Sequence, residues 1–273
     1  MKPIKKALLL HDLCGVGKAA LTNMIPVLGA MEIEACPVPT VLLSTHTGGY
    51  GLPAVLPVPA DYIRSCADHY VNNGMHFDVI FIGYIGTEEM ADAIEYFLSR
   101  FPETLVIMDP IMGDHGKFYS NFGWPYLEAV KKLVPSADIL LPNLTEACLL
   151  TGIPYDEDCP PSCLLQIAGA LDQNQGTSVI ITSVPAMQNE KAVAVYEEGA
   201  MQILKLPNAG REYHGSGDLF DAVFTGNYLR GYSLEVCVQR AHDFVAECIR
   251  ESMKYDYEEK EGLLIEKILP ELV

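Results

Sequence analysis

Basic residues are scarce in this chain of 273 residues, because 18 Lys and Arg stand against 36 Asp and Glu and give a formal net charge of −18. A nucleic-acid interface needs clusters of Lys and Arg that displace counterions, and the densest cluster here is the pair Lys5–Lys6. We therefore expect no nucleic acid as a partner. An anionic ligand would instead be held by backbone N–H groups, helix N-termini and a divalent cation.

Long apolar runs and secretory features are also lacking. Nearly uncharged apolar stretches such as 77–86 fall far short of the roughly 18–20 residues that a membrane-spanning helix needs. The eight cysteines form no Cys-x-x-Cys motif, and the closest pair is Cys159 and Cys163. No leader pattern opens the chain, so this cysteine usage predicts reduced thiols in a cytoplasmic protein with no membrane partner.

Several familiar catalytic motifs are missing as well. Segment 12–19 contains Gly17-Lys18 but lacks both the first glycine and the following Ser or Thr of a Walker A loop. The same segment lacks the third glycine of a dinucleotide fingerprint. The histidines and cysteines show no zinc-ligand spacing, and no Gly-x-Ser-x-Gly elbow occurs. These absences exclude several common enzyme classes.

What the chain does contain is an alternation of apolar runs and helical periodicity, which is typical of βαβ units. It predicts one α/β domain over 1–273, with a mainly parallel sheet covered by helices and a small antiparallel edge hairpin at 192–196 and 201–206. The other expected strands lie at 7–10, 35–43, 78–82, 105–108, 139–141 and 178–182. The expected helices lie at 18–31, 61–72, 87–100, 218–230, 234–254 and 261–269, with Thr87 as an N-cap.

Polar residues follow the predicted strands at the same edge of the sheet. In such sheets ligands bind at the carboxyl ends of the strands, so these residues together predict a binding site. They are His11, Asp12, residues 44–48, Gly83, Tyr84, Asp109, Asp114, Asn143, Glu146, Thr182 and Ser183.

The segment 214–218 (His-Gly-Ser-Gly-Asp) leads directly into a predicted helix. A glycine-rich turn at a helix N-terminus presents unpaired N–H groups that suit a phosphoryl group. Asp218 would repel such an anion, but its presence makes sense if it accepts a proton beside the phosphate. The alternative is that Asp218 is only an acidic residue stabilising the start of the helix.

Three motifs occur in the order and spacing of the ribokinase-like superfamily: 109–114 (Asp-Pro-Ile-Met-Gly-Asp), Asn143-x-x-Glu146 and 215–218. Within it, 44–48 (Ser-Thr-His-Thr-Gly) and Gly83-Tyr84 resemble the pyridoxal/pyridoxamine kinase branch, and the similarity runs nearly end to end. The hydroxymethylpyrimidine (phosphate) kinase branch of thiamine synthesis shares the first and last motifs and is the competing assignment. A vitamer-binding protein without catalysis is a third alternative.

The resemblance implies an ATP-dependent kinase that phosphorylates the hydroxymethyl group of a B6 vitamer (pyridoxal, pyridoxamine or pyridoxine) in salvage of pyridoxal 5′-phosphate. By this resemblance Asp218 is the catalytic base. The residues implied to contact ATP are Asp109, Asn143, Glu146, Thr182, Ser183, Gly215, Ser216 and Gly217. Those implied to hold Mg²⁺ are Asp109, Asp114 and Glu146, with K⁺ as a further cation.

The residues implied to contact the vitamer are Asp12, His46, Thr47, Tyr84 and Asp218. The chain departs from the family pattern at His11-Asp12, where better-known pyridoxal kinases have a Ser-His pair after the first strand. Asp12 would then be the residue at the pyridine ring, which favours a vitamer with a positive charge or a donor near the ring. We also expect Glu146 to line a cleft, and family analogy suggests a homodimer.

Overall fold

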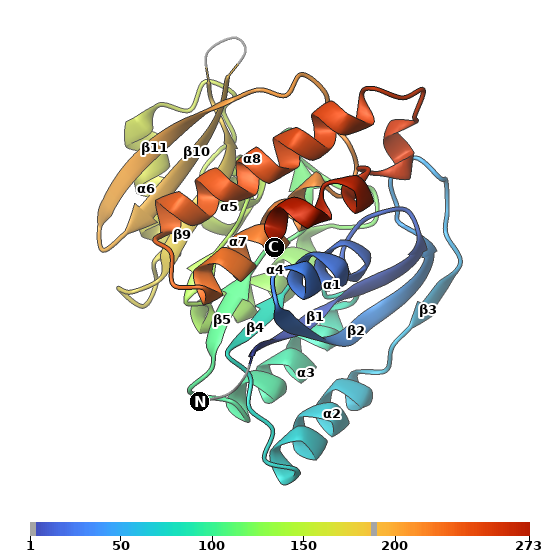
Figure 1. Ribbon diagram of the computed structural model, residues 1–273. Coiled ribbons are helices and arrows are strands. Elements are labelled where there is room, and N and C mark those ends of the chain that lie inside the picture. Colours follow the sequence, from blue (N-terminus) through green and yellow to red (C-terminus); the bar gives the residue numbers. More distant parts are fainter. Residues whose placement is uncertain (1–3, 187–189) are drawn as a thin grey trace.

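The computed structural model describes residues 4–186 and 190–273, and nine strands within them form one sheet in the order β11-β10-β9-β8-β5-β4-β1-β2-β3 (Figure 1). The strands are β1 (Lys5–Val16), β2 (Ile33–Thr45), β3 (Val55–Pro57), β4 (Val79–Ile82), β5 (Leu105–Met108), β8 (Ile139–Leu140), β9 (Ser178–Val184), β10 (Glu190–Glu197) and β11 (Ala200–Pro207). A separate two-stranded ribbon pairs β6 (Gly113–Asp114) with β7 (Lys117–Phe118).

The centre of the sheet is parallel and its two edges are antiparallel. Parallel pairing runs from β2 through β1, β4, β5 and β8 to β9. At one edge β10 and β11 form an antiparallel hairpin, and at the other β3 pairs antiparallel with β2. The predicted α/β fold with an edge hairpin is confirmed.

Helices cover both faces of the sheet. They are α1 (Leu21–Ala30), α2 (Ala60–Asn72), α3 (Glu88–Ser99), α4 (Trp124–Leu133), α5 (Leu144–Thr151), α6 (Pro161–Leu171), α7 (Ser216–Leu229) and α8 (Leu234–Ser252). Strand β1 shows how one sequence serves both layers, because successive side chains of a strand point to opposite faces. Leu8 and Leu10 pack with α2 to α6, whereas Ala7 and Leu9 pack with α1, α7 and α8.

Two predictions about element bounds are wrong. The first strand does not end at residue 10: β1 continues to Val16, so His11 and Asp12 lie within the strand, where the pairing with β2 shifts register between His11 and Leu13. Segment 261–269 is not a single helix, because Gly262 takes φ 76° and ψ −168° and separates the short 3₁₀ turns Glu259–Glu261 and Ile265–Lys267. A third 3₁₀ turn, Leu269–Leu272, follows.

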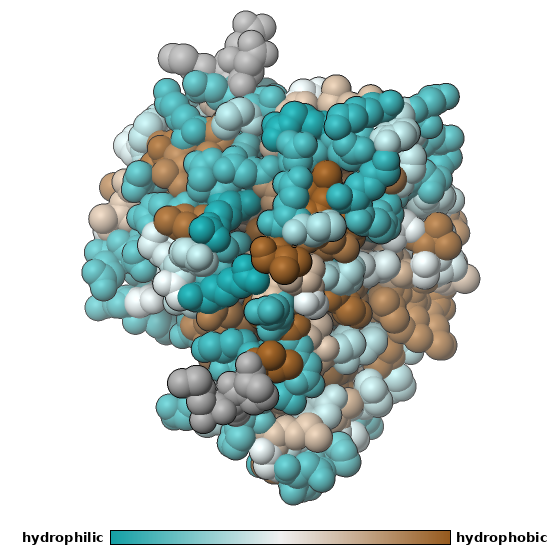
Figure 2. All heavy atoms as spheres, viewed as in Figure 1, coloured by the Kyte–Doolittle hydropathy of each residue, from teal (hydrophilic) through white to brown (hydrophobic). Residues whose placement is uncertain are grey.

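Thr87 does occupy the N-cap position of α3, as predicted, but its side chain makes no capping hydrogen bond. No helix in the described ranges 4–186 and 190–273 is long and apolar enough to cross a membrane. The surface over α8 and the C-terminal turns is mainly hydrophilic, with apolar side chains in separate patches (Figure 2).

The topology brings the predicted site together. The carboxyl ends of β1, β4, β5, β8 and β9 lie at one edge of the sheet because these strands are parallel. Helix α7 packs beside α1, and the first turns of both helices lie near the end of β1. Helix α5 begins just beyond β8.

Candidate active site

The glycine turn at the start of α7 is shaped by its contact with the loop before α1. Gly215 is the N-cap in a left-handed conformation (φ 78°), and a Cβ there would lie 1.9 Å from the carbonyl oxygen of Lys18. Only glycine meets both conditions. The buried Asn23 side chain donates hydrogen bonds to the carbonyl oxygens of Lys18 (2.8 Å) and Gly215 (3.0 Å), which fixes the two loops together.

This turn presents backbone amides to the edge of the sheet. The Ser216 hydroxyl donates to the carbonyl oxygen of Tyr213 (2.7 Å), so it serves the turn rather than a ligand. The first intrahelical bond of α7 is made by the Leu219 amide to Gly215. The amides of Gly217 and Asp218 come before Leu219 in the chain. They are among the first N–H groups of a helix, which have no hydrogen-bond acceptor within the helix. This is the geometry expected of an anion site.

Asp218 lies in the first turn of α7 beside His11. Its Oδ1 is 3.2 Å from Nε2 of His11, whose Nδ1 is 2.9 Å from Oδ1 of Asp12. Burial alone would lower the pKa of His11, but the hydrogen bonds to the two aspartates raise it to about 10. Burial would raise the pKa of Asp218, but its pairing with His11 and a hydrogen bond from the Ala20 amide lower it. Asp218 is therefore ionised at neutral pH.

A second carboxyl pair lies deeper, where Asp109 at the end of β5 meets Asp221, one turn after Asp218 on α7. Burial and the neighbouring Asp221 carboxylate raise the pKa of Asp109 well above its usual value. Burial also raises the pKa of Asp221, which is 3% exposed. The two carboxyls are therefore close neighbours in a buried environment, and among the described residues the second oxygen (Oδ2) of Asp221 has no hydrogen-bond partner.

Asn143 and Glu146 clamp the loop after β5 to the start of α5. They form a capping box, in which Asn143 Oδ1 accepts from the Glu146 amide (2.9 Å) and Glu146 Oε2 accepts from the Asn143 amide (2.9 Å). Glu146 Oε1 also accepts from the Met112 amide (3.0 Å), and Asn143 Nδ2 donates to the Gly113 carbonyl (2.8 Å). Glu146 is 3% exposed, so the expectation that it lines a cleft is not met by an open, solvent-facing side chain. Its oxygens are occupied by backbone donors.

The three carboxylates expected to hold Mg²⁺ differ in their surroundings. Asp109 and Glu146 are buried, whereas the Asp114 side chain is 38% exposed and accepts from the His115 amide. In residues 4–186 and 190–273 no group of three or more His, Cys, Asp or Glu side chains is gathered to hold a metal by itself. Burial and then repulsion from Asp109 raise the pKa of Glu146. The donor set therefore suits a cation that reduces this repulsion while drawing further oxygen ligands from water or a polyphosphate.

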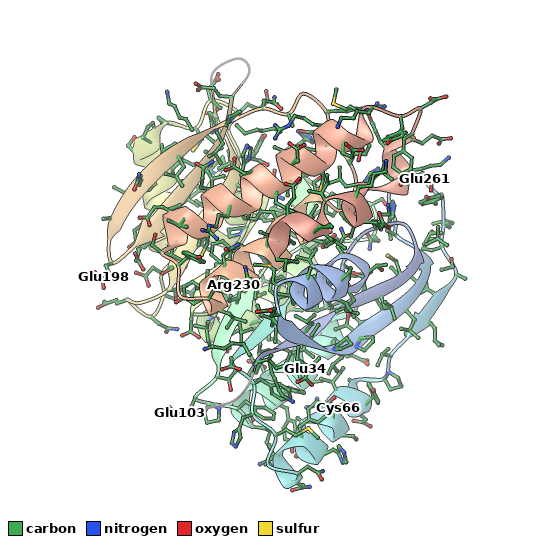
Figure 3. All side chains as sticks on the ribbon, in the orientation of Figure 1. Glu34, Cys66, Glu103, Glu198, Arg230 and Glu261 are labelled. Atoms are coloured by element: carbon green, nitrogen blue, oxygen red, sulfur yellow. The ribbon has the colours of Figure 1, made fainter. Side chains whose placement is uncertain are left out.

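The vitamer-contacting residues expected from the family lie near the ends of β1, β2 and β4, but their polar atoms are partly occupied. His46 accepts from the Gly48 amide at Nδ1 (3.0 Å), so its Nε2 carries the proton and donates to the Lys260 carbonyl (2.7 Å). Any contact from His46 to a ligand would thus come from ring carbons. The turn that carries Lys260 includes Glu261, labelled in Figure 3. Thr47 is exposed.

Tyr84 packs edge-on against Phe122 (5.4 Å between ring centroids), and its hydroxyl accepts from Asn121 (3.4 Å). Burial, and then the negative charge of Asp12, raise the pKa of Tyr84. Thr182 and Ser183 lie at the end of β9, where Thr182 bridges to Asn143 and Ser183 takes φ 55°. The structure thus places Thr182 beside Asn143 at the start of α5, whereas Ser183 is exposed.

Sequence reasoning missed roles for His11, Ala20, Asn23 and Asp221. His11 was visible only as a polar residue near a strand end, and Asp221 follows Asp218 at helical spacing but sits among apolar residues. Ala20 takes φ 52°, which a non-glycine residue adopts rarely. An aspartate on the buried face of a helix is the one signal that could have pointed to a polar cluster.

Known proteins resemble this chain over most of its length. A family model described as phosphomethylpyrimidine kinase matches residues 24–262. Pyridoxal kinase PdxY of Corynebacterium diphtheriae is 33% identical over 245 residues, covering 85% of this chain and 83% of that protein.

Two solved structures have the same fold over nearly the whole chain. One is a Bacteroides thetaiotaomicron protein named as a phosphomethylpyrimidine kinase and crystallised with pyridoxal, with a TM-score of 0.92, 33% identity, and coverage of 98% of this chain and 96% of that one. The other is pyridoxal kinase from Lactobacillus plantarum, with a TM-score of 0.90, 33% identity and the same coverage. The chain belongs to the phosphomethylpyrimidine kinase family, in its ribokinase-like pyridoxal kinase branch.

Proposed function

We propose that this protein is an ATP-dependent kinase that phosphorylates the hydroxymethyl group of a B6 vitamer, whether pyridoxal, pyridoxamine or pyridoxine, for salvage of pyridoxal 5′-phosphate. The observation that carries the proposal is the ionised Asp218 directly after the Gly215 turn, within one helix N-terminus. A proton acceptor and an anion site are thereby adjacent. The pyridoxal kinases among the relatives, and the pyridoxal-bound structure, support a B6 vitamer as the acceptor.

In this proposal the residues of the chain align and neutralise rather than form covalent intermediates, as is general for phosphoryl transfer. Asp218 takes the proton of the attacking hydroxyl. The turn formed by Gly215, Ser216 and Gly217 holds the transferred phosphoryl group through its unpaired backbone amides, aided by the positive end of the α7 dipole. A weak base suffices, because proton transfer lags behind a loose displacement.

We place Mg²⁺ and the polyphosphate at the ends of β5, β8 and β9. Mg²⁺ would neutralise the charge of the ATP phosphates there. The cation would be bound, directly or through water, by Asp109, Asp114 and Glu146. The ATP phosphates would be contacted by Asn143, Thr182 and Ser183. K⁺ is proposed as a further cation, which replacement of K⁺ by Na⁺ in the assay tests.

We propose that the pyridine ring lies between Asp12, Tyr84 and the His46-Thr47 loop. His11 already neutralises one oxygen of Asp12, so a ring contact would use the other. The family analogy further suggests a cytoplasmic homodimer.

The phosphorylation of hydroxymethylpyrimidine or its phosphate is the second candidate function. It is favoured by the family description, since the matching family model is that of phosphomethylpyrimidine kinase. ADP release with pyridoxal, pyridoxamine, pyridoxine and hydroxymethylpyrimidine separates the two functions. We expect the highest kcat/KM with a B6 vitamer, and turnover of hydroxymethylpyrimidine alone would refute the proposal. Binding without turnover would indicate the non-catalytic alternative.

A further inference from the structure

His11 is held in one orientation by its neighbours. The side chain is 1% exposed and stacks on Phe81, with ring centroids 6.1 Å apart and planes 12° from parallel. The ring also lies against Gly83, where a Cβ would come within 2.2 Å of Cδ2 of His11. The space for the ring exists only because residue 83 has no side chain. Such close packing fixes the direction of both ring nitrogens.

Each ring nitrogen faces a carboxylate. Nδ1 lies 2.9 Å from Oδ1 of Asp12 and Nε2 lies 3.2 Å from Oδ1 of Asp218. The Asp12 amide also lies 2.9 Å from Nδ1. Nδ1 thus faces an amide donor and a carboxylate oxygen at the same distance, and both contacts hold the ring in one orientation. Within residues 4–186 and 190–273 Nε2 makes no aligned hydrogen bond, and its ion-pair contact is with Oδ1 of Asp218 at 3.2 Å.

Asp218 is held from a second direction as well. The backbone amide of Ala20 faces its carboxylate and helps to lower its pKa. Ala20 takes φ 52° and ψ −134°, outside the favoured regions for a residue with a Cβ. Strain of this kind persists where the surroundings fix it and is found most often at functional sites. Asp218 keeps 14% exposure on its side chain, so it remains accessible from the sheet edge.

We infer that His11 is a positioning residue for the proposed catalytic base: its Nε2–H fixes Oδ1 of Asp218, while Asp12 fixes the imidazole from the opposite nitrogen. The inference rests on the proposed function, because it assigns His11 to the same transfer step. His11 itself does not touch the reacting atoms. It keeps the Asp218 carboxylate ionised and in one rotamer, so that the acceptor hydroxyl meets an aligned base.

Other charged groups also act on Asp218, and a pH profile must take them into account. Like charges come from β5 and α7, and a histidine lies at the end of β2. The titratable groups that face Asp218, besides His11, are Asp109, Asp221, His46, Cys14 and Tyr119. Replacing His11 removes the one cation of this set that pairs directly with the carboxylate.

The test compares two substitutions that each keep one ring nitrogen's role. His11→Gln places an amide N–H near the position of Nε2 and can still donate to Asp218, whereas His11→Asn mimics Nδ1 and leaves Asp218 without that donor. We expect His11→Asn to lower kcat by roughly 10–100-fold with little change in KM for ATP. The acid limb of its kcat–pH profile should move up by about one pH unit. His11→Gln should show a clearly smaller loss of kcat than His11→Asn.

His242→Gln serves as the matched control, since His242 lies on α8, bonds the Pro207 carbonyl and is not among the charged groups that act on Asp218. It should leave kcat and the pH profile unchanged. Equal losses in His11→Asn and His11→Gln, with unshifted pH profiles and lowered melting temperatures, would mean that His11 only packs the core.

A measurement that needs no turnover separates failure of this inference from failure of the proposed function. In ¹⁵N-histidine NMR of the wild-type protein at pH 8, His11 should carry a proton on Nε2, and Asp218→Asn should shift that resonance. An unprotonated Nε2, or one insensitive to Asp218→Asn, would overturn the inference. If the wild-type protein phosphorylates no vitamer, the proposed function falls, while the NMR result still decides whether His11 holds Asp218.

Discussion

At the scale of single residues, Asp218 has two competing interpretations, a base for phosphoryl transfer and an acid that merely stabilises the start of α7. The structure gives it an ion-pair partner in His11 and places the Ala20 amide where it lowers the pKa of the carboxylate, neither of which a helix-capping role requires. These contacts hold the carboxylate where the glycine turn presents its amides. The catalytic interpretation therefore explains more of the observed geometry.

Asp218→Asn keeps the size and polarity of the side chain but cannot take the proton. We expect kcat to fall by roughly 10²–10⁴-fold, the contribution of a positioned general base. ATP affinity should hold or rise slightly, because one negative charge leaves the phosphate site. Steady-state kinetics and the melting temperature of the same variant check this expectation. Near-normal turnover with a small loss of stability would favour the capping role.

The pKa of His11 predicts how stability depends on pH. The folded protein holds its proton up to about pH 10, against an ordinary value of 6.5. The stability that this ion pair contributes is therefore fully present below pH 6.5 and is lost as the pH rises through about 10. The melting temperature of wild-type protein should exceed that of His11→Gln most at pH 6.5, and the difference should narrow toward pH 10. A difference that stays constant would contradict the charge assigned to His11.

At the scale of elements, the turn before α7 depends on a glycine that fits beside the loop before α1. Gly215→Ala combines a left-handed φ with a Cβ 1.9 Å from the Lys18 carbonyl oxygen. We expect a loss of roughly 2–5 kcal/mol in the free energy of unfolding, together with loss of activity. Gly74→Ala is the matched control, because Gly74 also has a positive φ (62°) but no atom of residues 4–186 or 190–273 lies within 4 Å of an added Cβ.

Gly74→Ala should cost only about 1–2 kcal/mol, the cost of the left-handed conformation alone. Denaturant unfolding of both variants measures the difference. If the two variants lose the same stability, the close approach of the two loops does not constrain the turn.

Element types were predictable from the sequence, but several bounds and contacts were not. The alternation of apolar runs and helical spacing correctly predicted the parallel sheet, α7 and the edge hairpin, since these depend on local periodicity. The continuation of β1 through Asp12 depends on pairing with β2, which is a tertiary contact. The break at Gly262 in the predicted helix depends on backbone conformation that apolar spacing does not report.

In the candidate site, too, some features could be predicted from the sequence and others could not. The glycine turn and the strand-end carboxylates were predictable, because topology places them at one edge. The pairing of His11 with Asp218, and of Asp109 with Asp221, was not, because each joins segments about one hundred residues or more apart along the chain. The sequence also could not show that the side chains of Glu146 and His46 accept hydrogen bonds from backbone amides.

At the scale of the whole molecule, the excess of acidic residues has a consequence for catalysis. A chain of net charge −18 must bind a polyphosphate beside buried carboxylates. We therefore expect activity to require a divalent cation and to vanish in excess chelator, with recovery on addition of Mg²⁺. Circular dichroism in chelator should show that the fold is retained. Full activity in excess chelator would refute the assignment of Asp109, Asp114 and Glu146 to a cation.

The central claim is that this α/β molecule uses its sheet edge to phosphorylate a B6 vitamer. A competition assay tests it most directly: equimolar pyridoxal, pyridoxamine, pyridoxine and hydroxymethylpyrimidine are incubated with limiting ATP and Mg²⁺, and the phosphorylated products are measured by mass spectrometry. The ratio of products reports the ratio of kcat/KM values. The account predicts that phosphorylated vitamers dominate in the wild-type protein and are strongly reduced in Asp218→Asn. Dominance of phosphorylated hydroxymethylpyrimidine, or ADP formed without a phosphorylated acceptor, would contradict it.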